Sequence, residues 1–402
     1  MAHTDGVADG AEDSERVSPF YDPKVRGLFF QVILILIVGY LVYVGISNAA
    51  NNLARAGIAS GFGFFNERAG FDIGQSLIYY TNDSSYFRAF LVGLFNTLVV
   101  AAMGIFLATV VGFIVGLARL SRNYLVRKLA TVYVETLRNI PLLLQLLFWY
   151  KAVLAVLPSP RQTGIEQDVS LVWSLNNRGL YLPRLVPEDG SAIVFISVLV
   201  ALALWFVIGR WSYKRQMATG QRFPVLWTGL GLLFGLPLLA LLISGFPFYL
   251  EYASLQGFNM AGGWVIRPEF MALLLGLSLY TASFIAEIVR AGILAVPKGQ
   301  TEAAFALGVR PNLTSRLVII PQAMRVIIPP LTSQYLNLTK NSSLAVAIGY
   351  PDLVAVFGGT VLNQTGQAVE VISITMLVYL GISLLTSAFM NWFNSRVALV
   401  ER

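Results

Sequence analysis

Cysteine is absent from this sequence, and histidine occurs once, at His3. Without cysteine the chain can form neither a disulfide nor a thiolate metal site. His3 lies in a polar terminal segment, where we expect a solvated side chain rather than a general base. Charged residues are also scarce: they make up 12% of the chain, against 56% hydrophobic residues, with a mean hydropathy of +0.69. This balance is too apolar for a water-soluble protein of this length and predicts a membrane protein.

The sequence also lacks the motifs of bond-breaking chemistry. It contains no Gly-Lys dipeptide, which excludes the glycine and lysine loop that holds the phosphates of ATP. HExxH, GxSxG and Cys/His arrangements are missing too. We therefore expect no catalytic residue, no metal and no cofactor in this chain. The net charge is +7, but Lys and Arg are dispersed between apolar runs, which argues against nucleic-acid binding.

Apolar stretches of about 20 residues can cross a hydrocarbon core of about 30 Å. The predicted spans are Leu28–Ile46, Phe90–Leu117, Leu129–Leu157, Ala192–Ile208, Pro224–Ile243, Phe270–Ala295, Val326–Ile348 and Val371–Phe393. The predicted fold class is therefore an all-α polytopic membrane protein with about eight transmembrane helices. No cleavage site directly follows the first span, so we expect it to remain as an anchor.

Positive charge predicts the orientation of these spans. Basic residues fill alternate loops: Arg119, Arg122, Arg127 and Lys128; Arg210, Lys214, Arg215 and Arg222; Lys298, Arg310, Arg316 and Arg325. By the positive-inside rule these loops are cytoplasmic, and with an even number of spans both termini are cytoplasmic as well. The loops Ser47–Ala89 and Pro158–Ser191, which are polar and aromatic, are expected outside.

The segment Gln300–Arg325 lies in one of the predicted cytoplasmic loops. We expect a short helix that begins at Gln300 or Thr301, carries Glu302 at the positive end of its dipole, and ends at Gly308. Its apolar residues suit a groove in another protein: Ala303, Ala304, Phe305 and Leu307. A connecting loop with a single helical turn explains the spacing equally well.

The same segment resembles the EAA loop of MetI-like, type I permeases of ABC importers. The residues in register with that pattern are Glu302, Ala303, Ala304, Gly308 and Pro321. Val318 and Ile320 replace the usual Ile and Leu, with similar packing volume. The resemblance implies a type I ABC importer transmembrane domain in which this loop docks a separate ATPase.

Further blocks resemble the polar amino-acid branch of that family. They are Glu135–Gln145, Tyr280–Ile293 and Lys340–Leu344, in which Asn341 replaces the usual Asp. An extra first helix and inserted helices resemble the first permease subunit of general L-amino-acid importers and of glutamate, glutamine, aspartate and asparagine importers. The implied domains are a cytoplasmic tail 1–27, a helix with a periplasmic loop 28–89, a transporter domain 90–394 with an insertion at about 158–268, and a cytoplasmic tail 395–402.

The resemblance also implies partners. These are ABC ATPase subunits that carry Mg-ATP, a homologous second permease subunit in a heterodimer, a periplasmic amino-acid-binding protein and the bilayer of a bacterial inner membrane. The implied activity is import of L-amino acids by alternating access.

Polar residues inside the spans suggest a solute path, since a charge at the centre of a membrane helix costs about 2.5 to 3.5 kcal/mol. Glu287 and Lys340 either pair with each other or hold the ammonium and carboxylate of an amino acid; a purely structural pair is equally compatible. Arg290 is expected to extend to the cytoplasmic surface. Asn96, Gln145 and Ser343 are further candidates for the path, although buried amides more often bond between helices.

Other residues indicate packing rather than transport. Gly104, Gly112 and Gly116 predict close helix contact, and Pro141, Pro329 and Pro330 predict broken or bent helices.

Two alternatives stay open from the sequence. The first is an ion-coupled secondary amino-acid transporter, although two matching halves with broken segments are not evident. The second is a membrane scaffold that recruits a partner and transports nothing.

Overall fold

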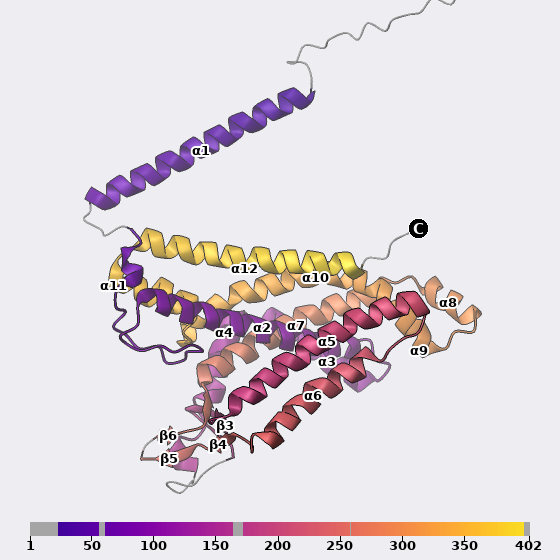
Figure 1. Cartoon of the computed structure of the whole chain (residues 1–402). Coiled ribbons are helices and arrows are strands. Elements are labelled where there is room, and N and C mark those ends of the chain that lie inside the picture. The colour runs from indigo at the N-terminus through magenta and orange to yellow at the C-terminus, as the bar shows by residue number, and fades with distance from the viewer. Residues whose placement is uncertain (1–22, 56–60, 164–171, 258, 398–402) are drawn as a thin grey trace, which may run out of the picture.

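A computed structural model describes residues 23–55, 61–163, 172–257 and 259–397 (Figure 1). The α-helices are α1 (Pro23–Arg55), α2 (Tyr86–Ala118), α3 (Tyr124–Asn139), α4 (Leu142–Leu147), α5 (Ser191–Thr219), α6 (Val225–Ile243), α7 (Pro268–Leu294), α8 (Lys298–Ala306), α9 (Pro311–Thr314), α10 (Ile320–Asn341), α11 (Leu362–Thr365) and α12 (Ala368–Val397). The 3-10 and π helices are η1 (Gly63–Asn66), η2 (Phe148–Leu154), η3 (Pro160–Thr163), η4 (Ser315–Ile319), η5 (Ser342–Ile348) and η6 (Val354–Val361). Residues 1–22 and 398–402 of the two predicted tails lie outside the described residues, whereas 23–27 and 395–397 belong to α1 and α12.

Within the described residues, six helices are long and apolar enough to cross a membrane: α1, α2, α5, α6, α7 and α12. All six fall on predicted spans. The predicted span Leu129–Leu157 is instead divided into α3, α4 and η2, because Ile140 is extended before Pro141. The predicted span Val326–Ile348 falls on α10 and η5. Pro329 and Pro330 lie inside α10, which continues through both of them.

The centre of the molecule is a close-packed pair of helices, α2 and α7. A Cβ atom on Gly112 would lie 2.6 Å from Cβ of Ile285, and one on Gly116 would lie 2.8 Å from the carbonyl oxygen of Ala286. Only glycine permits this approach, so the predicted small-residue ridge is confirmed. Nearer the start of α2, Gly104 faces Leu338 of α10, so α10 also belongs to the core.

The insertion forms an arm beside this core. Its helices α5 and α6 pack mainly on each other, and strands β3 (Arg184–Pro187) and β4 (Phe248–Glu251) join as an antiparallel ribbon at the base of the hairpin. The other strands are β1 (Ser174–Asn176), β2 (Gly179–Leu182), β5 (Ser254–Gln256), β6 (Asn259–Ala261) and β7 (Trp264–Ile266). They pair in the orders β1-β2-β7 and β5-β6. The predicted all-α fold therefore needs one addition, a strand region at the end of the molecule where α5 and α7 begin.

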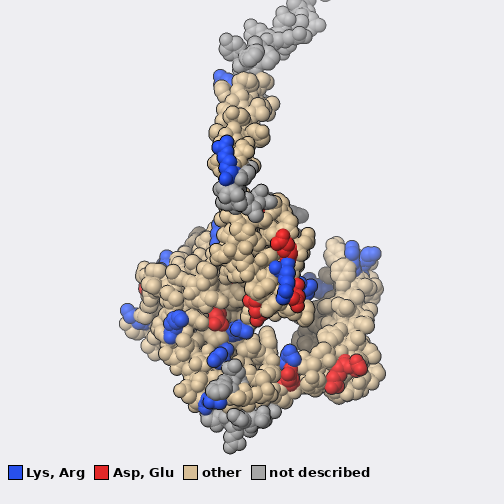
Figure 2. Space-filling view, turned by 90° about the vertical axis from the view of Figure 1, so that its left-hand side faces the viewer, with Lys and Arg blue, Asp and Glu red and all other residues tan. Residues whose placement is uncertain are grey.

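On the face shown in Figure 2, charged side chains are sparse among uncharged ones. Helix α1 exposes a row of large apolar residues and extends away from the other helices (Figure 1). Exposure of so much apolar area to water is unfavourable, whereas the hydrocarbon of a bilayer solvates it.

Candidate functional site

Helix α8 occupies the predicted EAA loop and lies beyond the end of α7 (Figure 1). Its N-cap is Pro297, so the helix begins at Lys298, earlier than the predicted start at Gln300 or Thr301. The predicted position of Glu302 at the positive end of the dipole is therefore wrong, because Glu302 lies in the second turn, where the dipole effect is weak. The predicted end at Gly308 is confirmed: Gly308 has φ +71°, the left-handed conformation that closes helices.

The surface of α8 divides into an inner and an outer side. Ala304 is buried against the chain, while Leu307 is 82% exposed and Phe305 is 49% exposed. Glu302 and Ala303 are exposed as well. On the inner side α8 contacts α9 and η4, and Gln322 Nε2 at the start of α10 donates a 3.2 Å hydrogen bond to Gln300 Oε1. Pro321 is the second residue of α10 and is half-buried. Helix α8 thus presents two large apolar side chains and a carboxylate to solvent, while its inner side contacts α9 and η4.

Glu287 lies near the end of α7 in a cluster of charges. Arg290 binds both of its carboxylate oxygens, with Nη2 to Oε1 at 2.6 Å and Nε to Oε2 at 3.1 Å. Arg119 at the end of α2 also binds Oε2 of Glu287 and lies 3.7 Å from Glu135 on α3. Arg290, which was expected to extend to the cytoplasmic surface, is partly exposed and pairs with Glu287. The cluster ties α2, α3 and α7 together next to α8.

Of the alternatives for Glu287 and Lys340, direct pairing is wrong, because Glu287 pairs with Arg119 and Arg290. Gly292 of α7 packs against Ile327 of α10. At about 1.5 Å per residue, Glu287 lies roughly 8 Å from Gly292 and Lys340 roughly 20 Å from Ile327, which leaves the two roughly 12 Å apart along the helices. Lys340 is exposed, and no salt bridge in the described part of the chain involves it. With Ser343 it lines a groove of about 420 Å³ against Tyr379 on α12. The Ser343 hydroxyl donates to the carbonyl oxygen of Lys340 at 2.7 Å.

The two buried amides of the predicted path hold backbone segments in place. Asn96 is fully buried, and its Nδ2 donates to the carbonyl oxygens of Gln75 at 2.9 Å and Pro351 at 2.8 Å. Gln145 Nε2 donates to the carbonyl oxygens of Leu137 at 2.8 Å and Ile140 at 2.9 Å. Those two carbonyls are freed where Pro141 interrupts the helix, so Gln145 compensates the break between α3 and α4.

A polar cavity of about 260 Å³ lies at the strand end of the core and was not predicted. Its charged and amide residues are Asp72, Gln75, Arg267 and Glu269. Tyr150 donates a 3.0 Å hydrogen bond to Glu269, and Gln75 Oε1 is buried without a partner among the described residues. Spacing in the sequence could not reveal this cavity, because it joins the loop before α2 to the start of α7.

Asp352 is a second unpredicted feature. It is fully buried in the turn between η5 and η6, outside the candidate spans, and its Oδ1 accepts a 2.8 Å hydrogen bond from the amide of Ala355. Tyr379 donates to its Oδ2 at 3.4 Å. Burial raises the pKa of Asp352 from 3.8 to about 7, although the hydrogen bonds oppose this shift. In the described residues no group of three His, Cys, Asp or Glu side chains is placed to hold a metal ion.

Comparison with known proteins assigns this chain to a family. Residues 108–399, from within α2 to two residues beyond α12, match the family described as "Binding-protein-dependent transport system inner membrane component". The chain belongs to this family. It is therefore a multi-pass membrane transport component, and the resemblance predicted from the EAA loop is confirmed.

Curated relatives of this inner membrane component span nearly its whole length. It is 57% identical over 388 residues to the general L-amino acid transport system permease protein AapQ of Rhizobium johnstonii, covering 96% of this chain and 95% of that protein. It is 44% identical over 411 residues to the glutamate/glutamine/aspartate/asparagine transport system permease protein BztB of Rhodobacter capsulatus, covering 95% of this chain and 96% of that protein. A solved structure of an amino acid ABC transporter with histidines aligns with a TM-score of 0.46 and 21% identity over 77% of this chain and 95% of that one.

Proposed function

We propose that this chain is the permease subunit of an ABC importer that carries L-amino acids across a bacterial inner membrane by alternating access. The observation that carries the proposal is α8, a helix of the EAA pattern that presents Phe305 and Leu307 to solvent while Ala304 anchors it. The family membership and the amino-acid transport named for both relatives support it.

The motor would be a separate ABC ATPase that carries Mg-ATP and grips α8. This chain itself would supply no catalytic residue, cofactor or metal ligand, and it would bind no nucleic acid. In the chain α8 lies between α7 and α10, and it contacts α9 and η4 and is hydrogen-bonded to the start of α10. A push on α8 would therefore be passed to α10 through these contacts and to α7 through the connecting turn. The ATPase cycle and solute binding would then bias one shared equilibrium between inward-open and outward-open states.

The orientation follows from charge. The turn between α5 and α6 lies at the end of the molecule opposite the strands, as does α8, since α5 and α7 both leave the strand region. Basic residues concentrate at this end, including Arg210, Lys214 and Lys298. We place it in the cytoplasm together with both termini. The strand region would then face the periplasm and the amino-acid-binding protein.

The permease would work as a heterodimer with a homologous second subunit, and the solute path would run between the two. Lys340 and Ser343, in the groove beside α12, are the proposed contacts for the solute carboxylate. Glu287, Asn96 and Gln145 would support this path indirectly, because their polar groups bind protein partners.

Reconstitution of the complex purified through this chain tests the proposal. Liposomes that hold the complex should take up L-amino acids only with ATP and the binding protein present, and the comparison should include acidic, amide, basic and aliphatic amino acids. Uptake driven by a proton or sodium gradient without ATP would instead identify a secondary transporter. ATPase binding with no uptake of any amino acid would identify a scaffold.

A further inference from the structure

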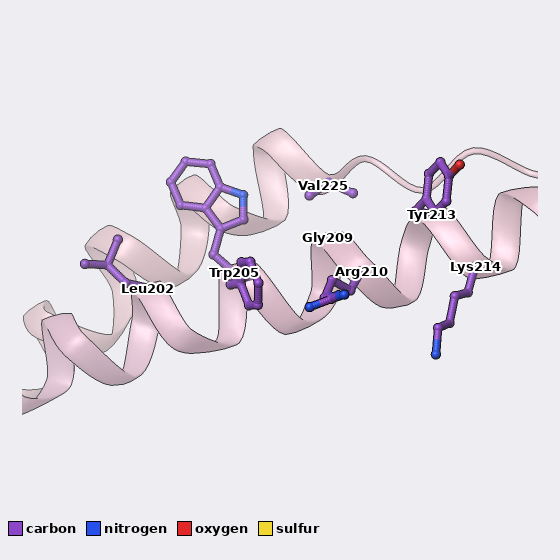
Figure 3. Close-up of a pocket in the computed structure, with 8 residues that line it drawn as sticks. Leu202, Trp205, Gly209, Arg210, Tyr213, Lys214 and Val225 are labelled. Carbon is purple, nitrogen blue, oxygen red and sulfur yellow. The ribbon is translucent and has the colours of Figure 1, made fainter. Parts of the chain in front are cut away.

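A groove of about 700 Å³ runs along one face of α5, beside the start of α6 (Figure 3). Its lining residues are Leu202, Trp205, Phe206, Gly209, Arg210, Tyr213, Lys214 and Val225. The helix spacing of three and four residues brings the seven that belong to α5 onto one face. The groove lies in the inserted hairpin, whose two helices pack mainly on each other.

The groove has an apolar end and a basic end. Leu202 and Trp205 lie at one end in Figure 3, Tyr213 and Lys214 at the other, and Arg210 between them. Trp205 locks the two helices together, since a Cβ atom on Gly229 of α6 would come within 2.2 Å of its indole ring. The apolar wall is therefore fixed in position rather than free to fill the groove.

No acidic residue occurs between Asp189 and Glu251, so the hairpin that carries the groove is purely cationic. Its basic residues are Arg210, Lys214, Arg215 and Arg222. Within the described part of the chain none of the four forms a salt bridge. Arg210 lies over the ring of Phe206 at 5.6 Å, and Arg215 donates a 3.0 Å hydrogen bond to Gln221 outside the groove. The two cations of the groove thus lack an anionic partner in this part of the chain.

The position of the groove along α5 places it in one leaflet of the bilayer. Arg210 follows the start of α5 at Ser191 by roughly 28 Å of helix, at about 1.5 Å per residue. This is close to the thickness of the hydrocarbon core, about 30 Å. With Ser191 at one edge of the core, Leu202 and Trp205 are immersed in the acyl region, and Arg210 and Lys214 reach the headgroups of the opposite edge.

We propose that this groove binds an anionic phospholipid of the cytoplasmic leaflet. One acyl chain lies along Leu202, Trp205 and Phe206, and the headgroup phosphate is held by Arg210 and Lys214 with Tyr213 beside them. Basic pockets between membrane helices on the cytoplasmic side favour anionic headgroups. The choice of leaflet rests on the orientation given under the proposed function; lipid binding itself does not.

Native mass spectrometry of the detergent-purified full-length chain tests this site with phosphatidylglycerol and phosphatidylethanolamine as probes. The wild type should retain phosphatidylglycerol in preference to phosphatidylethanolamine. The double variant Arg210→Gln/Lys214→Gln should lose on the order of tenfold or more in retained phosphatidylglycerol, as removal of two cations implies. The matched control Arg215→Gln/Arg222→Gln removes the same charge from the same hairpin outside the groove and should retain the lipid.

Gly209→Leu tests the apolar half without a change of charge. A Cβ atom at this position makes only an ordinary contact, 3.9 Å from Val225, so the larger side chain fills the groove without forcing the helices apart. It should reduce phosphatidylglycerol retention at an unchanged unfolding midpoint. Excess inorganic phosphate should not displace the lipid, because phosphate alone lacks the acyl contact.

Three results would overturn the proposal: equal lipid loss in both double variants, no preference for phosphatidylglycerol over phosphatidylethanolamine, or full displacement by inorganic phosphate. None of these readouts depends on transport. A failed uptake assay with intact lipid retention would therefore count against the proposed function and leave the lipid site standing.

Discussion

Glu287 and Lys340 show how differently two charged residues of one permease are placed. Arg119 and Arg290 both bind Glu287, and the side chain of Arg119 is only 10% exposed. Lys340 instead faces an open groove. The first residue is held in a structural cluster, whereas the second is free to meet a solute.

We therefore predict opposite effects for substitutions at these two positions. Glu287→Gln leaves Arg119 without its nearest carboxylate and should lower the free energy of unfolding by about 1 to 3 kcal/mol. Lys340→Met should leave stability unchanged but weaken uptake in the reconstituted complex. Thermal unfolding in detergent and uptake by the same preparations measure both. A normal uptake rate and substrate affinity for Lys340→Met would remove it from the solute path.

Gly112 allows α2 and α7 to approach, and its replacement should separate them. In Gly112→Ala the new Cβ atom meets Ile285 at 2.6 Å, so the helices must shift, at a cost of about 1 to 3 kcal/mol. Gly231→Ala in α6 is the matched control, because nothing lies within 4 Å of a Cβ atom there. Unfolding midpoints should fall for the first variant and not for the second. Equal midpoints would mean that the α2–α7 contact does not depend on this glycine.

Asp352 should make stability depend on pH. Because its pKa is raised from 3.8 to about 7 in the folded protein, the folded state retains a proton that the unfolded state has released in this interval. Its contribution to stability is thus full below about pH 3.8 and is lost as the pH rises through about 7. The slope approaches about 1.4 kcal/mol per pH unit for one proton.

Asp352→Asn should remove this slope, since an amide mimics the neutral carboxyl group. Unfolding of both proteins between pH 4 and 8 measures the difference. A wild type that becomes more stable across this range, with the variant following it, would contradict the assignment to Asp352.

Among the elements, α3–α4 and α8 show how the end of a helix is accommodated by the local sequence. Pro141 ends α3, and the buried Gln145 side chain binds the carbonyls that the break releases. Gly308 ends α8 in a left-handed conformation and leaves Leu307 exposed at its tip. Both breaks are stabilised by residues a few positions away in the chain, so local sequence is sufficient to indicate them.

Variants of α8 should separate coupling from folding. Glu302→Lys reverses the charge on the exposed side, and Gly308→Leu strains a residue whose φ is +71°. Either should reduce ATPase co-purification and uptake while the membrane helices stay folded. Gly299→Ala, which meets nothing within 4 Å on the same helix, should have no effect. Normal ATPase binding and uptake in both test variants would exclude α8 as the docking site.

On the scale of the whole molecule, the α5–α6 arm packs mainly on itself, so we expect the core to fold without it. The two helices pack mainly on each other, and strands β3 and β4 pair antiparallel up to Pro187 opposite Phe248. These strand ends are adjacent, so a two-residue Asn-Gly turn can replace residues 188–247.

The shortened protein should retain the core of α2, α7 and α10. We expect a monodisperse protein in detergent whose unfolding midpoint still responds to Gly112→Ala as in the full chain. Size-exclusion chromatography and thermal unfolding measure this. Aggregation of the shortened protein, or loss of its response to Gly112→Ala, would show that the arm is part of the core.

The candidate site was predictable only where its signals are close together in the sequence. The EAA loop places Glu302, Ala303, Ala304 and Gly308 within one short helix, so the motif alone located α8. Glu287 has two partners: Arg290 lies one turn away on the same helix, where local spacing can indicate it. Arg119 was not predictable, because it is distant in the chain and nothing in the sequence favours it over Lys340. The polar cavity at Arg267 and the burial of Asp352 were not predictable either, because both bring together segments that are distant in the chain.

The sequence by itself determined that the chain lies in a membrane, where the six long apolar helices lie, which glycines allow close helix packing and where α8 ends. Hydropathy, the lack of a side chain on glycine and helix-ending residues all act within a single helix. Tertiary structure alone decided which distant charges meet, where Asn96 donates, and that α5 and α6 form a separate arm on a strand ribbon. The physical reason is that hydrogen bonds and ion pairs depend on distances of a few ångströms between helices, and these distances are set by packing rather than by position in the chain.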